Sequence, residues 1–76
     1  MVKQVRIAQR RGGKRIRELR LERGWSQEFL AAEAGLNMNY LGGIERGERN
    51  PSLKNLARIA DALSVTVPDL VETLKT

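Results

Sequence analysis

The stretch that most constrains the fold of this chain is residues 27–46, QEFLAAEAGLNMNYLGGIER, in which two short helical patterns meet at Gly35. In the first pattern, apolar residues recur at steps of three and four, which places them on one face of a helix. These residues are Leu30, Ala31 and Ala34. We expect Ser26 to cap the start of this helix and Gly35 to end it, because a sharp exit favours a residue that tolerates positive φ. A helix is therefore predicted over residues 27–34.

The second pattern begins at Asn37, the expected N-cap of a helix over residues 38–46. Leu41 and Ile44 lie three residues apart and are predicted to form its inner face. The outward positions make a polar, aromatic and basic strip. They are Asn37, Met38, Asn39, Tyr40 and Gly43, followed by Arg46 and Arg49. The sequence thus predicts two helices that cross at a three-residue turn.

Two adjacent glycines, Gly42 and Gly43, lie inside the second helix. Each costs roughly 1 kcal/mol relative to alanine in a helix interior, so their presence needs a reason. A close approach of the backbone to another helix or to DNA would supply one. Tolerance of weak helix propensity at an exposed site is the other explanation, and the sequence does not choose between them.

Helical patterns also flank this stretch on both sides. Residues 14–23 form the first predicted helix, with Ile16 and Leu19 facing inward. Residues 52–63 and 68–74 form the last two, the former with a continuous apolar face. That face consists of Leu53, Leu56, Ile59, Ala60 and Leu63. We therefore predict an all-α domain of five helices.

The net charge of +5 is unevenly distributed along the chain. Residues 1–25 hold nine Lys and Arg against two Glu, which gives +7, whereas residues 26–51 give −2 and residues 52–76 give zero. Such asymmetry indicates a polyanion partner, because cationic side chains near phosphates release condensed counterions. A solvated basic tail is the alternative. We place an arm at residues 1–12, either lying along DNA or a disordered terminus, and the domain at residues 13–76.

Several classes of function are excluded by composition. The chain contains no cysteine and no histidine, so disulfides, zinc-finger sites and most nucleophilic or metal chemistry are not expected. The acidic residues are scattered along helical patterns and no Gly-rich phosphate loop follows a strand, so we predict neither an enzyme nor a cofactor. No apolar run approaches the roughly 18 residues of a membrane span, and a cytoplasmic location is expected.

Trp25, next to a helix end, is expected to pack in the core.

The helical stretch with its flanks resembles the helix-turn-helix of the lambda-repressor and Cro type, the Xre family, over residues 13–70. The residues that carry the resemblance are Gln27, Leu30, Ala31, Ala34, Gly35, Leu36, Asn37, Leu41, Ile44 and Glu45. The segment NYLGGIERGERNPSL, residues 39–53, is also similar to the controller proteins of restriction-modification systems and to many small repressors. The resemblance implies a compact five-helix domain. It further implies a partly buried ion pair between Arg20 and Glu45, and a DNA-backbone contact by Gln27.

A sequence-specific regulator of this kind would place the second helix in the major groove of double-stranded DNA. Asn39 is the leading candidate for a base contact, because a carboxamide pairs with adenine N6 and N7. Met38 would pack on a thymine methyl, Tyr40 would donate to a phosphate or base edge, and Gly43 completes the base-facing set. The residues expected on phosphates are Gln27, Asn37, Arg46, Arg49 and Asn50. The operator's position would decide whether RNA polymerase is blocked or assisted.

The last predicted helix carries more apolar surface than a terminal turn requires, in Leu70, Val71 and Leu74. A two-fold homodimer contact would bury that surface, and packing on the chain's own core is the alternative. A homodimer would favour a palindromic site. The competing function is a protein-interaction module with the same fold, such as an antitoxin or adaptor. Gly43 and the two acidic residues Glu45 and Glu48 favour it.

Overall fold

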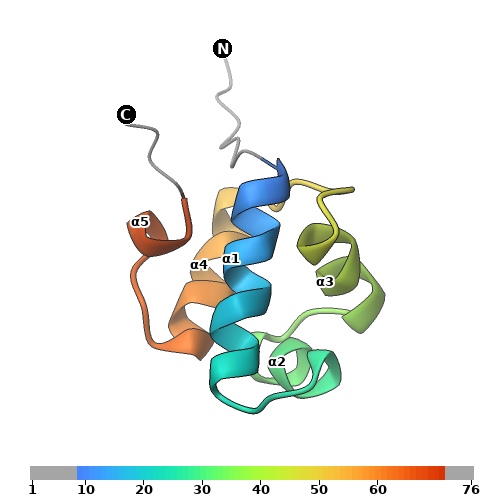
Figure 1. Cartoon of the computed structure of the whole chain (residues 1–76), viewed down its shortest axis with the longest axis vertical. Helices are drawn as coiled ribbons and strands as arrows, with labels where there is room; N and C mark the ends of the chain where they lie inside the picture. The colour runs from blue at the N-terminus through green and yellow to red at the C-terminus, as the bar shows by residue number, and fades with distance from the viewer. Residues whose placement is uncertain (1–8, 72–76) are drawn as a thin grey trace.

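The structure, a computed structural model, describes residues 9–71, and over that range it consists of five helices (Figure 1). Their bounds are α1 Gln9–Glu22, α2 Gln27–Ala34, α3 Met38–Glu45, α4 Leu53–Leu63 and α5 Val67–Leu70. The prediction of an all-α architecture with five helices is confirmed over these residues. None of the helices in residues 9–71 has the length and apolar character needed to cross a membrane.

The helices are arranged around α1 (Figure 1). In this view α3 and α5 lie on opposite sides of α1, and α2 lies below α3, towards the C-terminal end of α1. α4 packs on α2 and α5, while α3 packs on both α1 and α2. The face of α3 that points away from α1 is therefore separated from α5 by the body of the domain.

The predicted caps of α2 and α3 are confirmed. The Ser26 hydroxyl accepts a hydrogen bond from the amide of Phe29 at 3.0 Å, and Gly35 ends α2 with φ +72°. The amide of Leu36 then donates to the carbonyl of Ala31 at 2.8 Å, which closes the helix end and starts the turn. Both ends of the turn between α2 and α3 are therefore held by local hydrogen bonds.

The core is made by the apolar faces that periodicity predicted, with one error. Its members are Ile16, Leu19, Leu30, Ala31, Ala34, Leu41, Ile44, Leu56, Ile59, Ala60, Leu63 and Leu70. Leu53 was predicted to join them but is 58% exposed, because it is the first residue of α4. Trp25 is half-buried at the edge of the core, with its ring edge-on to Phe29 at a centroid distance of 4.8 Å.

α1 starts at Gln9, five residues before the predicted start of the first helix. Gly12 and Gly13 therefore lie within a helix instead of ending an arm. A Cβ atom on Gly13 would collide with the carbonyl oxygen of Ile44 and lie 2.8 Å from that of Glu45. Glycine here permits α1 to touch the backbone at the end of α3. The arm predicted for residues 1–12 remains a prediction at residues 1–8, which lie outside the described residues.

α5 is shorter than the predicted helix of residues 68–74. It begins one residue before Pro68 and is started by a capping box, in which Thr66 and Asp69 each accept a hydrogen bond from the backbone amide of the other. Leu70 is fully buried in the core of its own chain, which is the alternative to a dimer contact given above, and the dimer contact stays a prediction. Val71 is half-buried, and Leu74 lies outside the described residues.

Candidate nucleic-acid interface

The first turn of α3 is fixed by Asn37. Its side-chain oxygen accepts hydrogen bonds from the amides of Asn39 at 2.7 Å and Tyr40 at 3.1 Å, as an N-cap does. The Asn37 side-chain amide group remains available to donate, and Asn37 is exposed. Met38, which is 45% exposed, and Asn39 also face solvent, as predicted. Three consecutive side chains thus project from a helix start whose backbone is held in place.

Tyr40 follows them but is held more tightly. It is half-buried, and its hydroxyl oxygen accepts a hydrogen bond from the side-chain nitrogen of Asn55 in α4 at 3.1 Å. The guanidinium carbon of Arg49 lies 5.6 Å from the centre of the Tyr40 ring, within the range of a cation–π contact. Sequence reasoning missed Asn55, because no local pattern indicates a contact between residues fifteen positions apart.

The two glycines of α3 are buried, so the prediction that Gly43 faces outward is wrong. A Cβ atom on Gly43 would lie 3.1 Å from Cδ of Arg49, and one on Gly42 would lie 3.1 Å from an Arg46 guanidinium nitrogen. The arginine side chains from the following loop fold back and cover the helix here. The close approach is therefore made by side chains, and Gly43 offers no surface of its own.

Arg46 and Arg49 place two guanidinium groups next to α3, but Arg46 is paired. Its Nε donates to Glu48 at 3.0 Å in a contact that is more than half exposed. This hydrogen bond and the charge of Arg46 lower the pKa of Glu48 from its ordinary value, and the same contact raises the pKa of Arg46. Both groups are therefore charged at neutral pH. Asn50, half-buried, keeps a side-chain oxygen that no donor among the described residues satisfies.

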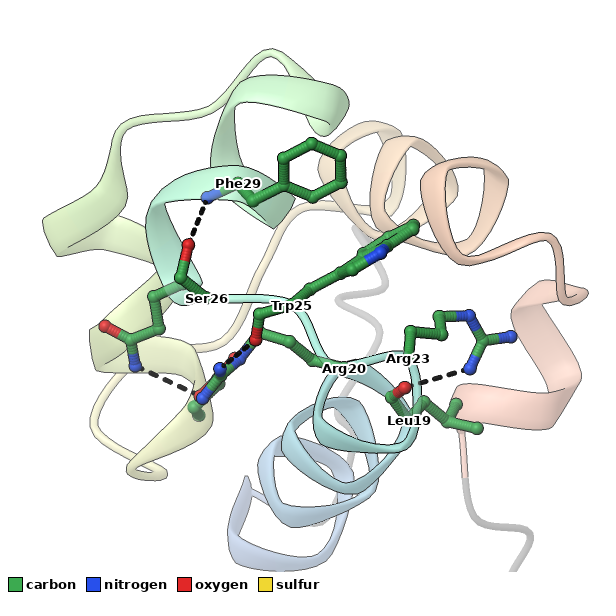
Figure 2. Close-up of polar contacts among 8 residues, drawn as sticks. Leu19, Arg20, Arg23, Trp25, Ser26 and Phe29 are labelled. Atoms are coloured by element: carbon green, nitrogen blue, oxygen red, sulfur yellow. Dashed lines mark hydrogen bonds and ion pairs between the residues drawn. The ribbon is translucent and has the colours of Figure 1, made fainter.

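The ion pair implied by the resemblance is present beneath this surface. Arg20 donates to Glu45 through two nitrogens, Nε at 2.8 Å and Nη2 at 3.0 Å, and the side chains are only 8% and 1% exposed. Arg20 also donates to the carbonyl of Trp25 at 2.8 Å, just before α2 (Figure 2). One residue of α1 thus holds both the entry to α2 and the end of α3.

Gln27, expected on the DNA backbone, is also joined to this pair. Its side-chain nitrogen donates to Glu45 at 3.0 Å, and the side chain is half-buried. An amide nitrogen carries two hydrogens, so one of them remains for a second acceptor. A phosphate contact by Gln27 stays a prediction. The hydrogen bond to Glu45 fixes the orientation of the Gln27 amide group that would make this contact.

Arg23 has a structural contact that sequence reasoning missed. It donates to the carbonyl of Leu19 at 2.9 Å (Figure 2). It also donates to the carbonyl of Leu63 at 2.6 Å, which ties the end of α1 to the end of α4. The Arg23 guanidinium therefore binds two backbone carbonyls of its own domain.

The comparisons with known proteins agree with this geometry. A helix-turn-helix family model matches residues 16–70. The control protein C.BamHI of Bacillus amyloliquefaciens is 44% identical over 61 residues, which are 79% of this chain and 75% of that protein. Other relatives are longer: the match spans 45% of the length of DdrOP3, an HTH-type transcriptional regulator of Deinococcus deserti that is 45% identical over 58 residues.

Solved structures show the same arrangement. The restriction-modification controller protein C.AhdI of Aeromonas hydrophila superposes with a TM-score of 0.81 at 46% identity, covering 83% of this chain and 96% of that one. SinR of Bacillus subtilis, solved in complex with DNA, superposes with a TM-score of 0.77 at 39% identity, covering 80% and 98%.

The fold is thus the compact lambda-repressor-like one that the sequence predicted, in a family of regulators and not of enzymes. A match that covers residues 16–70, together with relatives above 40% identity, decides the assignment. The chain belongs to the Xre-type helix-turn-helix family of DNA-binding transcriptional regulators and is closely related to the controller proteins of restriction-modification systems.

Proposed function

We propose that this chain binds a specific double-stranded DNA operator by inserting the first turn of α3 into the major groove, and that it regulates transcription in the cytoplasm from there. The observation that carries the proposal is the start of α3, where Asn37 fixes the backbone while Met38 and Asn39 project into solvent. A recognition helix reads bases with its N-terminal residues. At the start of α3 the side chains are exposed and the backbone that carries them is held in place, as base reading requires.

In this proposal Asn39 pairs with an adenine and Met38 packs on a thymine methyl. Asn37, Arg46, Arg49 and Asn50 reach phosphates around the helix, and the free amide hydrogen of Gln27 does so from the start of α2. The buried Arg20 and Glu45 pair neutralises a carboxylate that would otherwise repel phosphate. A restriction-modification operon is a setting that the relatives C.BamHI and C.AhdI support.

We further propose that two copies bind a palindromic operator, with recognition helices about 34 Å apart. The contact would be made at the side of the domain away from α3, where Val65, Val67 and Val71 are only partly buried. Leu70 takes no part, because it is buried in its own core. Sedimentation of the wild-type chain and of Val71→Glu tests this: loss of a dimer in the variant supports the contact, and an unchanged dimer places it elsewhere.

The test of DNA binding is selection of bound sequences from random duplexes, followed by a salt titration on the selected site. A regulator that neutralises several phosphates should lose affinity by orders of magnitude between about 50 and 200 mM salt. Asn39→Ala should weaken the selected site by about tenfold while leaving binding to unrelated duplexes nearly unchanged. An adaptor or antitoxin without DNA binding would select no sequence.

A further inference from the structure

The hydrogen bond between Asn55 and Tyr40 joins the start of α4 to α3, and it is not needed to build either helix. The Asn55 backbone amide already donates to the hydroxyl of Ser52 at 3.1 Å, which caps α4. The Asn55 side chain is therefore not used in capping α4, and it donates to the Tyr40 hydroxyl.

This contact decides what the Tyr40 hydroxyl can do. A hydroxyl has one hydrogen and can also accept, whereas the nitrogen of a side-chain amide can only donate. With the oxygen of Tyr40 occupied as an acceptor, its hydrogen must point elsewhere, and no group among the described residues accepts it. A hydroxyl that accepts one hydrogen bond also becomes a stronger donor in the next. The Tyr40 hydroxyl is therefore held in place, and its hydrogen can be donated to an acceptor outside the domain.

We propose that Asn55 is a positioning residue, which holds the Tyr40 hydroxyl as a hydrogen-bond donor to one phosphate oxygen of the DNA backbone. The inference rests on the proposed function, since it assigns a task within the same interface. The cationic group of Arg49 lies 5.6 Å from the Tyr40 ring, so the surroundings of the hydroxyl favour an anionic acceptor. Tyr40 is also half-buried beside α4, whereas the exposed Met38 and Asn39 are the side chains free to reach bases.

A double-mutant cycle in operator affinity tests whether Asn55 acts through Tyr40. Tyr40→Phe removes the donor and should weaken binding about tenfold, as expected for a hydrogen bond to a charged group. Asn55→Ala should weaken binding about threefold to fivefold. In the Tyr40→Phe background, Asn55→Ala should have no further effect. An equal loss in both backgrounds would overturn the proposal, and so would the absence of a loss in the wild-type background.

Asn55→Asp is the second variant, and it changes the direction of the hydrogen bond. A carboxylate only accepts, so it would draw the Tyr40 hydrogen away from DNA, while an acidic residue in the first turn suits α4. We expect a larger loss than with Asn55→Ala when Tyr40 is present. The double variant Tyr40→Phe/Asn55→Asp, compared with Tyr40→Phe, measures the repulsion between the new charge and phosphates alone. Any further loss by Asn55→Asp when Tyr40 is present then comes from the redirected hydroxyl. Binding by Asn55→Asp that equals wild type would refute the role.

The acceptor is identified with duplexes in which single phosphates are replaced by neutral methylphosphonates. At one position, the tenfold effect of Tyr40→Phe should disappear. If Tyr40→Phe costs the same on every substituted duplex, the acceptor is not a phosphate and the proposal falls. Thermal unfolding of each variant shows whether the fold is retained. If the wild-type chain selects no DNA, both proposals fail, whereas DNA binding with an additive cycle removes only the role of Asn55.

Discussion

Arg20 in α1 and Glu45 at the end of α3 form a bidentate ion pair that is almost completely buried. The pair joins the central helix to the C-terminal end of the recognition helix, and Gln27 donates to the same carboxylate from α2. Three helices of the interface therefore meet at one charged group. Their relative orientation depends on electrostatic contacts inside the domain as well as on apolar packing.

Removing one partner of this pair should destabilise the domain strongly. Glu45→Ala leaves the Arg20 guanidinium buried without a counter-charge, which is expected to cost about 3 to 5 kcal/mol. Urea denaturation of wild type, Glu45→Ala and the milder Glu45→Gln measures the change. Glu45→Gln should lie between the other two, because it keeps hydrogen-bonding capacity without the charge. A cost below about 1 kcal/mol for both variants would show that the pair is not a major contact.

Gly13 should not tolerate a side chain. A Cβ atom at this position meets the carbonyl oxygens of Ile44 and Glu45, which belong to the backbone and cannot rotate away. We expect Gly13→Ala to lower the free energy of unfolding by about 1 to 3 kcal/mol, the usual cost of overpacking.

Gly42→Ala is the matched control for Gly13→Ala. Its Cβ atom would meet only the ends of the Arg46 and Gln27 side chains, which can move. Stability should stay level or rise by up to about 1 kcal/mol, because alanine is the better helix former. Chemical denaturation compares the two variants. Equal destabilisation by both would contradict the close approach of α1 to α3.

Glu48 should weaken DNA binding in the wild-type chain. It holds Arg46 in an exposed ion pair and adds a negative charge near the proposed phosphate contacts. Glu48→Gln releases Arg46, so affinity for any duplex should rise by up to about fivefold. This factor corresponds to the free energy of one exposed ion pair. Fluorescence anisotropy at low salt is the measurement. Weaker binding by Glu48→Gln would mean that the pair orients Arg46 productively.

Asp69 should contribute to the acid sensitivity of the fold. The backbone amide of Thr66, and then its hydroxyl, lower the pKa of Asp69 from its ordinary value of 3.8. The unfolded chain then binds the proton more readily than the folded one, so this contribution is complete above the ordinary value and is lost as the pH falls through the folded value. The stability difference between wild type and Asp69→Asn should shrink as the pH is lowered from neutral to below the ordinary value of 3.8. A constant difference would exclude the effect.

The sequence predicts the fold well wherever the determinants are local. The caps at Ser26, Gly35 and Asn37 each depend on residues within a few positions, and the structure has all three. The inner faces of the helices follow from periodicity because burial repeats with the helical turn. The Arg20 and Glu45 pair is different, since only the resemblance to a family implied it.

Several of the errors concern contacts that helical periodicity does not show. The arm is predicted over residues 1–12 and the first helix from residue 14, so no helical role is predicted for Gly13, and only the position of α3 shows why glycine is required there. Gly43 was placed on the surface because periodicity cannot show that Arg49 folds back over it. The contact between Asn55 and Tyr40 was missed for the same reason. The surroundings of Gly43 and Tyr40 in the candidate site are thus set by packing around α3.

Backbone amide NMR shifts, recorded as the selected operator is added to the labelled chain, show which face of the domain meets DNA. We predict the largest changes at residues 37–40 and at Arg49, with smaller ones at Gln27 and Asn55. Residues of α5 should change little on DNA binding itself, because α5 lies on the opposite side of α1 (Figure 1). Saturating binding that leaves residues 37–40 unshifted, with the changes gathered on another face, would contradict the placement of α3 in the major groove.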